Sequence, residues 1–278
     1  DLPINFKCID TVGNRASYLT RVFYELFYLP VLIKRGGYDV VFIPNGQLYG
    51  VKINGVKYVS MFRNMLPFSS EHISRFGFKK RLRYRILNWV TRMTFVRSDS
   101  VIFISEYARS IIRSIMPSID NKSTVIYHGV TFPDYANDQQ LISYKKIDDI
   151  KLLYVSIYNN YKHQIELVRA LARLREVLGV CPTLWLIGYD HLPYAESLKA
   201  EVSQSGMTDK VLLLGGMGHE HQVGYYKESD GLIFASSIEN CPNILLEKMV
   251  AAKPIMCSSC GPMPEVIGEN KYMFNPLD

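Results

Sequence analysis

Short apolar runs recur along the chain and alternate with longer amphipathic stretches. The runs are four to six residues long and rich in Val, Ile and Leu, which is typical of strands buried on both faces of a sheet. In the N-terminal half they predict strands at residues 39–43, 57–61, 101–104 and 124–127. In the C-terminal half they predict strands at residues 151–156, 183–187, 211–214, 231–235 and 254–257.

Helical patterns separate these runs, and the clearest spans residues 164–179. Gly179 is a stop signal at its end. The apolar stripe of this helix consists of Leu167, Leu171, Leu174 and Leu178. Because strands that alternate with helices form parallel sheets through right-handed crossovers, the fold class is predicted to be α/β.

The same pattern predicts two domains. Residues 131–149 are polar and show no strand pattern, so they are interpreted as a connection. We predict an N-terminal domain at residues 1–130, a linker at residues 131–150 and a C-terminal domain at residues 151–278, and a chain of 278 residues is long enough for two. Two α/β domains that face each other form a cleft at the carboxyl ends of their strands, where ligands of this architecture bind.

Composition is that of ordinary globular domains. Hydrophobic residues make up 48% of the chain and charged residues 21%, which excludes a disordered or low-complexity protein. Five cysteines, an odd number, argue against a disulfide framework and for a reducing compartment. Cys257 and Cys260 form a single CxxC without a second pair to complete a zinc site, so we interpret them as ordinary thiols at a strand end.

The charge is divided unevenly. Residues 1–130 hold 19 Lys and Arg against 8 Asp and Glu, whereas residues 131–278 hold 13 against 18. A basic N-terminal half can attract nucleic acid, anionic lipid or phosphorylated substrates, and charge alone does not choose among them. No apolar stretch reaches the roughly 20 residues of a membrane span and no signal peptide is evident, so we expect a cytoplasmic protein, soluble or peripheral to the inner face of the membrane.

The most informative stretch is residues 232–267. A strand is followed by a Ser-Ser-Ile-Glu-Asn-Cys-Pro loop, and a helix begins near Asn243; Glu239 lies in the loop and Glu247 about one turn into the helix. A helix N-terminus favours an anion such as a diphosphate, and two carboxylates can accept hydrogen bonds from sugar and ribose hydroxyls. The alternative is that the two glutamates belong to a solvated face.

This stretch resembles the donor-site signature of the retaining glycosyltransferase family 4, which has the GT-B fold of two Rossmann-like domains. The signature is a Glu, seven residues, a second Glu, a helix of small residues and a Gly-Pro-x-Pro-Glu turn. The resemblance implies that Glu239 contacts the transferred sugar and that Glu247 holds the ribose of the nucleotide. It also implies that the sugar pocket is lined by Asn240, Cys241, Pro242 and Asn243.

Other segments carry the same resemblance. Residues 153–173 resemble the family's strand, loop and lysine segment, and Lys162 is the matching lysine. Its point charge can hold a diphosphate leaving group, although from position alone it could equally be a solvated loop lysine. Residues 184–188 and 211–215 match the next two strands, so we place Gly188 and Gly215 at the donor site. Residues 101–108 and 125–130 match segments that close the acceptor domain.

Two positions depart from the family pattern. Ile157 stands where the family usually has an Arg, five residues before the lysine, and Asn64 stands where it commonly has a His. The YKHQ and NMLPF segments resemble those of a polysaccharide or O-antigen type subgroup of mannosyltransferases or related glycosyltransferases. Asn64 is therefore a catalytic candidate together with Glu239 and Lys162.

Arg63 and His128 are acceptor or cleft candidates. Arg63 could replace the missing cation at the leaving group, or it could form a structural pair with a carboxylate. His128 could line the cleft, or it could be a turn histidine before Gly129.

The resemblance implies a reaction. A sugar would pass from a nucleoside-diphosphate sugar, with UDP or GDP as the nucleotide, to a glycan or lipid-linked acceptor, with retention of configuration and no protein nucleophile. The context would be synthesis of a cell-surface polysaccharide such as lipopolysaccharide. No Asp-x-Asp occurs in the chain, so we predict no metal and no cofactor. The alternative is a non-transferring GT-B relative, a sugar-nucleotide epimerase or binding module, which Ile157 and Asn64 keep open.

Residues Phe78–Arg97 carry seven Lys and Arg residues and no acidic one. Near-helical spacing relates Leu82, Ile86, Trp89, Val90 and Met93. One interpretation is a surface helix packed on its own sheet with a basic outer face. The other is a peripheral helix that docks on anionic lipid. Nucleic acid is disfavoured as a partner because no recognition motif accompanies the charge.

The family's pattern also extends beyond both ends of this sequence. A GT-B enzyme normally starts with a strand and a Gly-rich turn, and ends with a helix that crosses back to the first domain. Neither is evident here, so we expect a truncated chain.

Overall fold

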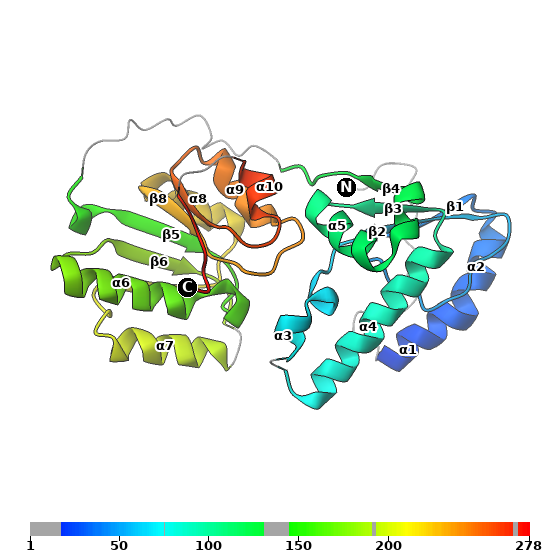
Figure 1. The fold of residues 1–278 in the computed structure, drawn as a ribbon, viewed down its shortest axis with the longest axis horizontal. Helices are drawn as coiled ribbons and strands as arrows, with labels where there is room; N and C mark the ends of the chain where they lie inside the picture. The colour runs from blue at the N-terminus through cyan, green and yellow to red at the C-terminus, as the bar shows by residue number, and fades with distance from the viewer. Residues whose placement is uncertain (1–17, 75, 131–144, 191–192, 269–271) are drawn as a thin grey trace. The chain divides into compact units, whose positions relative to one another are not determined.

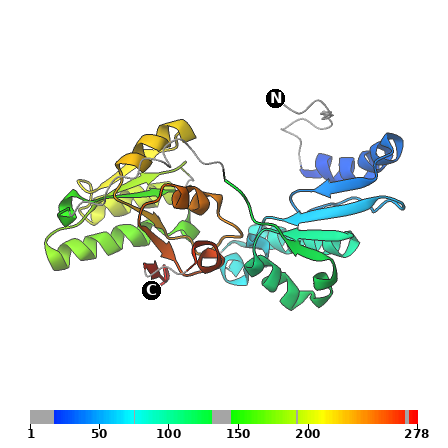
Figure 2. The same ribbon diagram turned by 90° about the horizontal axis from the view of Figure 1, so that it is seen from above.

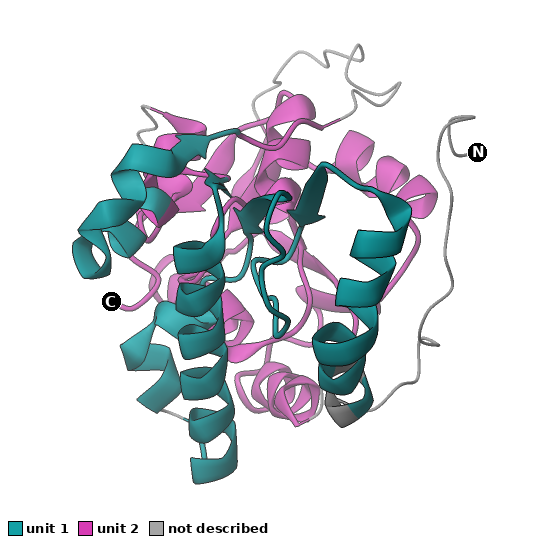
Figure 3. Cartoon of the chain, turned by 90° about the vertical axis from the view of Figure 1, so that its right-hand side faces the viewer, with its two compact units in different colours: residues 1–103, 109–126 teal, residues 104–108, 127–278 magenta. Residues whose placement is uncertain are grey.

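The chain forms two compact units, each described here by itself. The computed structural model describes residues 18–74, 76–130, 145–190, 193–268 and 272–278. Unit 1 comprises residues 1–103 and 109–126, and unit 2 comprises residues 104–108 and 127–278 (Figure 3). The boundary therefore falls a few residues before the predicted position 130. Most of the predicted linker, residues 131–144, lies outside the described residues.

Unit 1 is built on a four-stranded parallel sheet (Figure 1). Its strands lie in chain order, β1-β2-β3-β4, with Val41 paired to Tyr58 and Ser60 paired to Val101. The strands are β1 Val40–Ile43, β2 Lys57–Phe62, β3 Ser100–Phe103 and β4 Ser123–Val125. All four strand predictions for this half are confirmed to within two residues at each end.

The helices of unit 1 include one long helix, α4 Phe78–Arg97. The others are α1 Tyr18–Phe23, the π-helical turn η1 Tyr24–Tyr28, α2 Leu29–Gly36, η2 Leu66–Phe68, α3 Ser70–Ser74, α5 Glu106–Ile115 and η3 Pro117–Lys122. The first three residues of α5 belong to unit 2. α4 connects β2 to β3, and its first half runs past the sheet (Figure 1).

The buried face of α4 differs from the predicted apolar stripe. Within that stripe Val90 is buried and Met93 partly buried, whereas Leu82, Ile86 and Trp89 are exposed. The buried side chains of α4 are Leu87, Val90, Thr91, Thr94 and Phe95. The buried face of α4 therefore begins at Leu87, and Leu82, Ile86 and Trp89 lie outside it.

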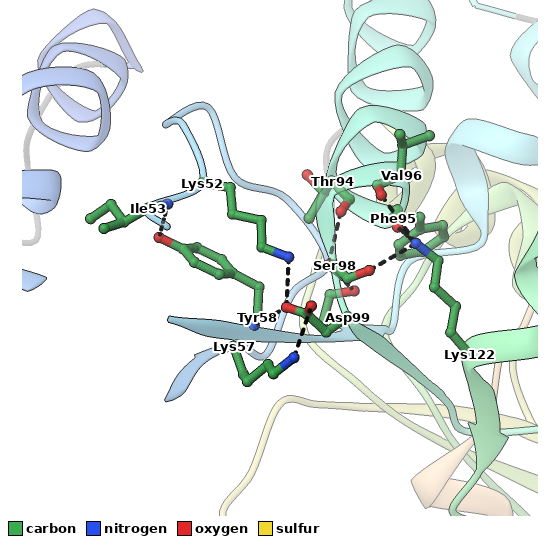
Figure 4. Close-up of polar contacts among 11 residues, drawn as sticks. Lys52, Ile53, Lys57, Tyr58, Thr94, Phe95, Val96, Ser98, Asp99 and Lys122 are labelled. Carbon is green, nitrogen blue, oxygen red and sulfur yellow. Dashed lines mark hydrogen bonds and ion pairs between the residues drawn. The ribbon is translucent and has the colours of Figure 1, made fainter. Parts of the chain in front are cut away.

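A polar network fastens the end of α4 to the sheet (Figure 4). Asp99 accepts hydrogen bonds from Lys52 Nζ and from the backbone N–H of Tyr58, both at 2.8 Å. The hydrogen bond from Lys52 is the largest of the effects that lower the pKa of Asp99. Lys122 Nζ donates to the carbonyls of Phe95, Val96 and Ser98 at 2.7, 3.1 and 2.8 Å. A cation on the last carbonyls of a helix satisfies them and complements the helix dipole.

Unit 2 contains a six-stranded, all-parallel sheet in the order β10-β9-β8-β5-β6-β7. The strands are β5 Lys151–Val155, β6 Thr183–Ile187, β7 Val211–Gly215, β8 Gly231–Phe234, β9 Ile255–Ser258 and β10 Met273–Phe274. The five strand predictions for this half are confirmed to within one residue. The sequence did not predict β10, which has only two residues.

The strand order of unit 2 reverses beside its first strand. The chain runs outward from β5 through β6 to β7, then returns to place β8 on the other side of β5. In doubly wound sheets, such a switch point opens a crevice at the carboxyl ends of the two strands concerned. The loops after β5 and β8 therefore emerge where this architecture binds ligands.

Helices cover both faces of this sheet (Figure 2). α6 and α7 lie on one face, and α8 and α9 lie on the other. The elements are η5 Ile147–Asp149, η6 Asn160–Lys162, α6 Gln164–Leu178, α7 Tyr194–Gln204, α8 His219–Glu228, α9 Asn243–Val250 and α10 Met263–Ile267. The α6 prediction is confirmed, with Gly179 left-handed at its end, although Leu178 of the predicted stripe is exposed. In the described part of the chain, no helix combines the length and apolarity that a membrane crossing requires.

We expect Lys122→Met to lower the free energy of unfolding by about 1–2 kcal/mol, because three helix-terminal carbonyls lose a charged donor. Urea unfolding measures the change. Lys79→Met, on the exposed first turn of α4, is the matched control and should shift stability by under about 0.5 kcal/mol. Equal stability of the two variants would contradict a capping role for Lys122.

Candidate functional site

The candidate site lies at the switch point of unit 2, where the loops after β5 and β8 are tied together. Ser237 N–H donates to the carbonyl of Tyr161 at 2.9 Å. The hydroxyls of Ser236 and Ser237 both lie 3.4 Å from the same carbonyl oxygen. One backbone group of the first loop thus anchors the start of the second, which brings the predicted residues of the two loops together.

Lys162 and Glu239 form an ion pair across these two loops. Lys162 Nζ donates to Glu239 Oε1, with side-chain exposures of 7% and 16% respectively. The ammonium also lies 5.4 Å from the centroid of the Phe234 ring. The interpretation of Lys162 as a solvated loop lysine is therefore wrong. Removing one partner of a buried pair leaves the other charge uncompensated, so the pair acts as a unit.

His163, next to Lys162, has a rare backbone conformation, and its side chain also connects the two loops. Its φ of 56° is left-handed, which is uncommon for a residue other than glycine and persists where the surroundings enforce it. Its Nε2 lies 2.7 Å from Ser237 Oγ, and its Nδ1 lies 3.7 Å from Glu166 Oε2. The sequence does not predict a role for His163, since the periodicity of residues gives no sign of a positive φ.

The predicted sugar-pocket residues differ in burial. Asn240, Cys241 and Pro242 are buried, and Asn240 Oδ1 accepts a hydrogen bond from Ser105 Oγ at 3.3 Å. Burial raises the pKa of the Cys241 thiol, which keeps it protonated at neutral pH.

Asn243 is exposed at the first position of α9, as the sequence predicts. Its Oδ1 lies 2.6 Å from Nδ1 of His128, so His128 lies beside the start of this helix. Glu247 is partly buried one turn further along α9.

Gly188 and Gly215 have structural reasons to be glycine. A Cβ on Gly188 would lie 1.8 Å from the carbonyl oxygen of Ser156, and Gly215 has a φ of 72°. The two residues are joined by a backbone hydrogen bond of 2.9 Å at the carboxyl edge of the sheet. Their predicted role in donor binding stays a prediction.

Arg63 and Asn64 follow β2 in unit 1 and are exposed. Asn64 Oδ1 accepts a hydrogen bond from Leu66 N–H at 3.2 Å and so begins the turn into η2. Arg63 forms no ion pair with any of the described residues, so the alternative of a structural Arg–carboxylate pair finds no support there.

Lys248 is a second buried cation that the sequence analysis missed. It lies directly after Glu247, yet its side chain is fully buried and its Nζ donates to the carbonyl of Val155 at 3.1 Å. Burial, followed by the charge of Lys162, lowers the pKa of Lys248 to about 7. From sequence, a Glu-Lys dipeptide on a short helix is expected to be exposed to solvent. The burial of Lys248 follows from the packing of α9 on the sheet.

The carboxylate of Glu265, in the Gly-Pro-x-Pro-Glu turn, binds backbone outside its own segment. Its two oxygens accept hydrogen bonds from the N–H groups of Glu106 and Tyr107, at 2.6 and 2.7 Å. A hydrogen bond to Glu265 also raises the pKa of Tyr127 to about 12. These contacts explain why residues 104–108 belong to unit 2.

Metal-ligating side chains do not gather in the described ranges: no group of three or more His, Cys, Asp or Glu has the arrangement of a metal site there. Cys257 and Cys260 are free thiols, and burial raises the pKa of Cys257 to about 12.

Two family profiles match the chain. The profile described as glycosyl transferases group 1 matches residues 130–277, more than half of the 278 residues. The profile described as glycosyltransferase family 4 matches residues 9–132. The boundary between the two matches lies close to the boundary between the two units.

Similar proteins include an uncharacterized glycosyltransferase of Methanocaldococcus jannaschii, MJ1607, which is 25% identical over 238 residues. The match covers 83% of this chain but 60% of that protein, so the chain spans less than two thirds of its length. The structure resembles that of WaaG, a glycosyltransferase involved in lipopolysaccharide biosynthesis, with a TM-score of 0.68, 20% identity and coverage of 96% of this chain and 72% of WaaG. It also resembles Anabaena HepE in complex with UDP-glucose, with a TM-score of 0.63, 18% identity and coverage of 89% and 68%. These likenesses confirm the predicted GT-B fold.

We expect Lys248→Met to raise the free energy of unfolding near pH 6.5, with the difference from wild type closing as the pH rises to about 10. The folded pKa of about 7 lies below the ordinary lysine value of 10.5. Between these values the unfolded wild-type chain binds more protons than the folded chain, so the stability of the wild type increases with pH. A difference in pKa of this size corresponds to on the order of 5 kcal/mol below pH 7.

Urea unfolding from pH 6.5 to 9.5 measures this difference between the two proteins. Lys199→Met, which removes an exposed lysine, is the control and should give a difference that does not vary in this way. A constant gap between wild type and Lys248→Met would show that Lys248 stays charged when buried.

Proposed function

We propose that this chain, which belongs to the glycosyl transferases group 1 family, transfers a sugar from a nucleoside-diphosphate sugar to a glycan or lipid-linked acceptor. The observation that carries the proposal is the buried pair of Lys162 and Glu239 at the switch point between β5 and β8. It unites a cation and a carboxylate where this sheet architecture binds ligands.

The chemistry of glycosyl transfer needs both charges of this pair. Breaking the anomeric C–O bond develops positive charge on the sugar ring and negative charge on the departing phosphate oxygen. Lys162 supplies a cation for the diphosphate, and Glu239 supplies a carboxylate for the sugar. Because the two side chains already contact each other in the folded protein, they are oriented before the donor binds. Neither has to be reorganised from a solvent-exposed position.

The first turn of α9 supports the same assignment for the nucleotide. A helix N-terminus favours a diphosphate, and Glu247 can accept hydrogen bonds from the ribose hydroxyls. The complex of HepE with UDP-glucose makes UDP-glucose the first donor to try. A GDP-sugar is the second.

The finer features of the proposal follow from the family resemblance. We propose retention of anomeric configuration, with the acceptor attacking from the face of the leaving group and no protein nucleophile. Lys162 and the helix terminus take the place of a metal ion, and no cofactor takes part. We place the reaction at the cytoplasmic face of the membrane, in synthesis of a cell-surface polysaccharide.

Contact with the membrane is proposed for the exposed apolar face of α4 between Phe78 and Trp89. Phe78, Leu82, Ile86 and Trp89 are exposed there by 78, 47, 44 and 62%. Exposed basic side chains accompany them at Lys79, Lys80, Arg81, Arg83 and Arg85. Large apolar side chains flanked by cations suit a surface of anionic lipid, which is where a lipid-linked acceptor would be presented.

We expect one nucleoside-diphosphate sugar among UDP-, GDP-, ADP- and dTDP-sugars to raise the melting temperature, because a ligand that binds the native state stabilises it. Glu247→Ala should abolish that shift. Glu239→Gln should keep a shift with the nucleoside diphosphate but lower transfer at least about 100-fold, since a charge that acts on the transition state is lost. EDTA should leave transfer unchanged.

The outcomes of this panel separate the candidate functions. Release of nucleoside diphosphate only in the presence of acceptor supports a transferase. A melting shift without turnover for any acceptor supports the non-transferring relative that Ile157 keeps open. Absence of any shift, with this chain and with a longer one, would reject the donor site.

We expect the protein to bind vesicles that contain phosphatidylserine and not vesicles of phosphatidylcholine, and to lose binding as salt is raised. Co-sedimentation measures the bound fraction. The double variant Ile86→Ser/Trp89→Ser should bind at least fivefold more weakly. The matched control is Val177→Ser/Leu178→Ser, which removes two exposed apolar side chains from α6. An equal effect of both double variants would reject α4 as the docking surface.

A further inference from the structure

Lys248 is buried beneath the donor site with few groups to stabilise a charge. It points from α9 toward the carboxyl end of β5, where the carbonyl of Val155 is its hydrogen-bond acceptor at 3.1 Å among the described residues. The rings of Tyr154 and Phe234 lie 5.7 Å from the same nitrogen. An ammonium has three N–H donors, so this environment satisfies one of them and offers ring faces to the others.

Lys248 and Lys162 are close enough to sense each other. The Phe234 ring lies 5.7 Å from Nζ of Lys248 and 5.4 Å from Nζ of Lys162, so both ammonium groups flank one aromatic side chain. Little water separates them, since both side chains are buried. Charge–charge interactions are strong in such surroundings. Whatever neutralises Lys162 therefore also changes the cost of charging Lys248.

Two titratable groups next to Lys248 carry no charge near neutral pH. Burial keeps the pKa of Tyr154 on β5 well above its ordinary value and raises that of Cys257 on β9 to about 12, so both are uncharged. Glu247 on α9 itself and Glu239 on the loop after β8 act to raise the pKa of Lys248. His163 lies beside Lys162 on the turn after β5, so a test must distinguish it from Lys248.

We propose that Lys248 is a proton-binding positioning residue of the donor site: when a diphosphate anion occupies Lys162, Lys248 takes a proton from solvent and becomes charged. The inference rests on the proposed function. Bound negative charge offsets the repulsion from Lys162 and favours the ammonium form of Lys248, with a pKa near 7 in the free protein. Affinity for the donor then falls as pH rises above 7, by up to tenfold for each pH unit over which the proton is taken up.

Calorimetry tests this directly. UDP-glucose and GDP-mannose are suitable probes because a diphosphate diester has no ionisation of its own near pH 7.5. Titrations in buffers of different ionisation enthalpy give the number of protons taken up on binding. We expect donor binding to take up a substantial fraction of one proton in the wild type and in His163→Gln. We expect uptake to vanish in Lys248→Met and in Lys248→Gln, which keeps a donor for the Val155 carbonyl.

The inference and the proposed function fail in different ways. Donor binding with no proton uptake in wild type, or with equal uptake in the Lys248 variants, would overturn the inference and leave the proposed function standing. Uptake lost in His163→Gln alone would assign the proton to the imidazole and also overturn it. Failure of every donor to bind would count against the proposed function.

If no donor binds, a measurement without ligand tests the electrostatic coupling between Lys248 and Lys162. The pH midpoint of the stability difference between wild type and Lys248→Met reports the titration of Lys248. The double change Lys162→Gln/Glu239→Gln removes the neighbouring pair without leaving a lone buried charge. The midpoint should then move upward by at least half a pH unit, because the repulsion from Lys162 outweighs the attraction of Glu239. An unchanged midpoint would overturn the inference.

Discussion

The buried ion pair of Lys162 and Glu239 is the interaction on which the site depends. Its two members come from loops 77 residues apart, and they meet because β8 lies beside β5 instead of beside β7. A pair of this kind contributes little net stability, since desolvation offsets the attraction, but it strongly disfavours arrangements in which either charge is left alone. It therefore specifies one position of the two loops, and the hydrogen bonds of Tyr161 and Ser237 reinforce that position.

The strands were predictable because they follow from short-range pattern. Apolar runs located nine of the ten strands in the described residues, and the loop and helix that carry Glu239 and Glu247 were predicted from their resemblance to a family signature. Three features were not predictable. The left-handed backbone of His163 depends on its neighbours in space, the burial of Lys248 depends on the packing of α9, and the exposure of Trp89 depends on which face of α4 is covered.

These three features share a physical origin. Pattern along a chain reports which face of an element is apolar, but it does not report what covers that face. On α4 part of the apolar stripe meets solvent, whereas on α9 a lysine is covered completely. Each departs from the expected pattern of buried apolar and exposed polar residues, and such departures concentrate where function opposes stability. Both lie in segments for which we propose ligand contacts, with lipid in one case and with the donor in the other.

The carboxylate of Glu265 means that the boundaries of unit 2 do not follow the order of the chain. Because it binds the N–H groups of Glu106 and Tyr107, the chain enters unit 2 at residue 104, leaves it after 108 and returns at 127. A fragment cut at residue 127 would lack the five-residue segment that satisfies both Glu265 and Asn240. The smallest piece of this protein that contains all of unit 2 is therefore discontinuous in sequence, and a peptide or a circular permutation would have to supply residues 104–108.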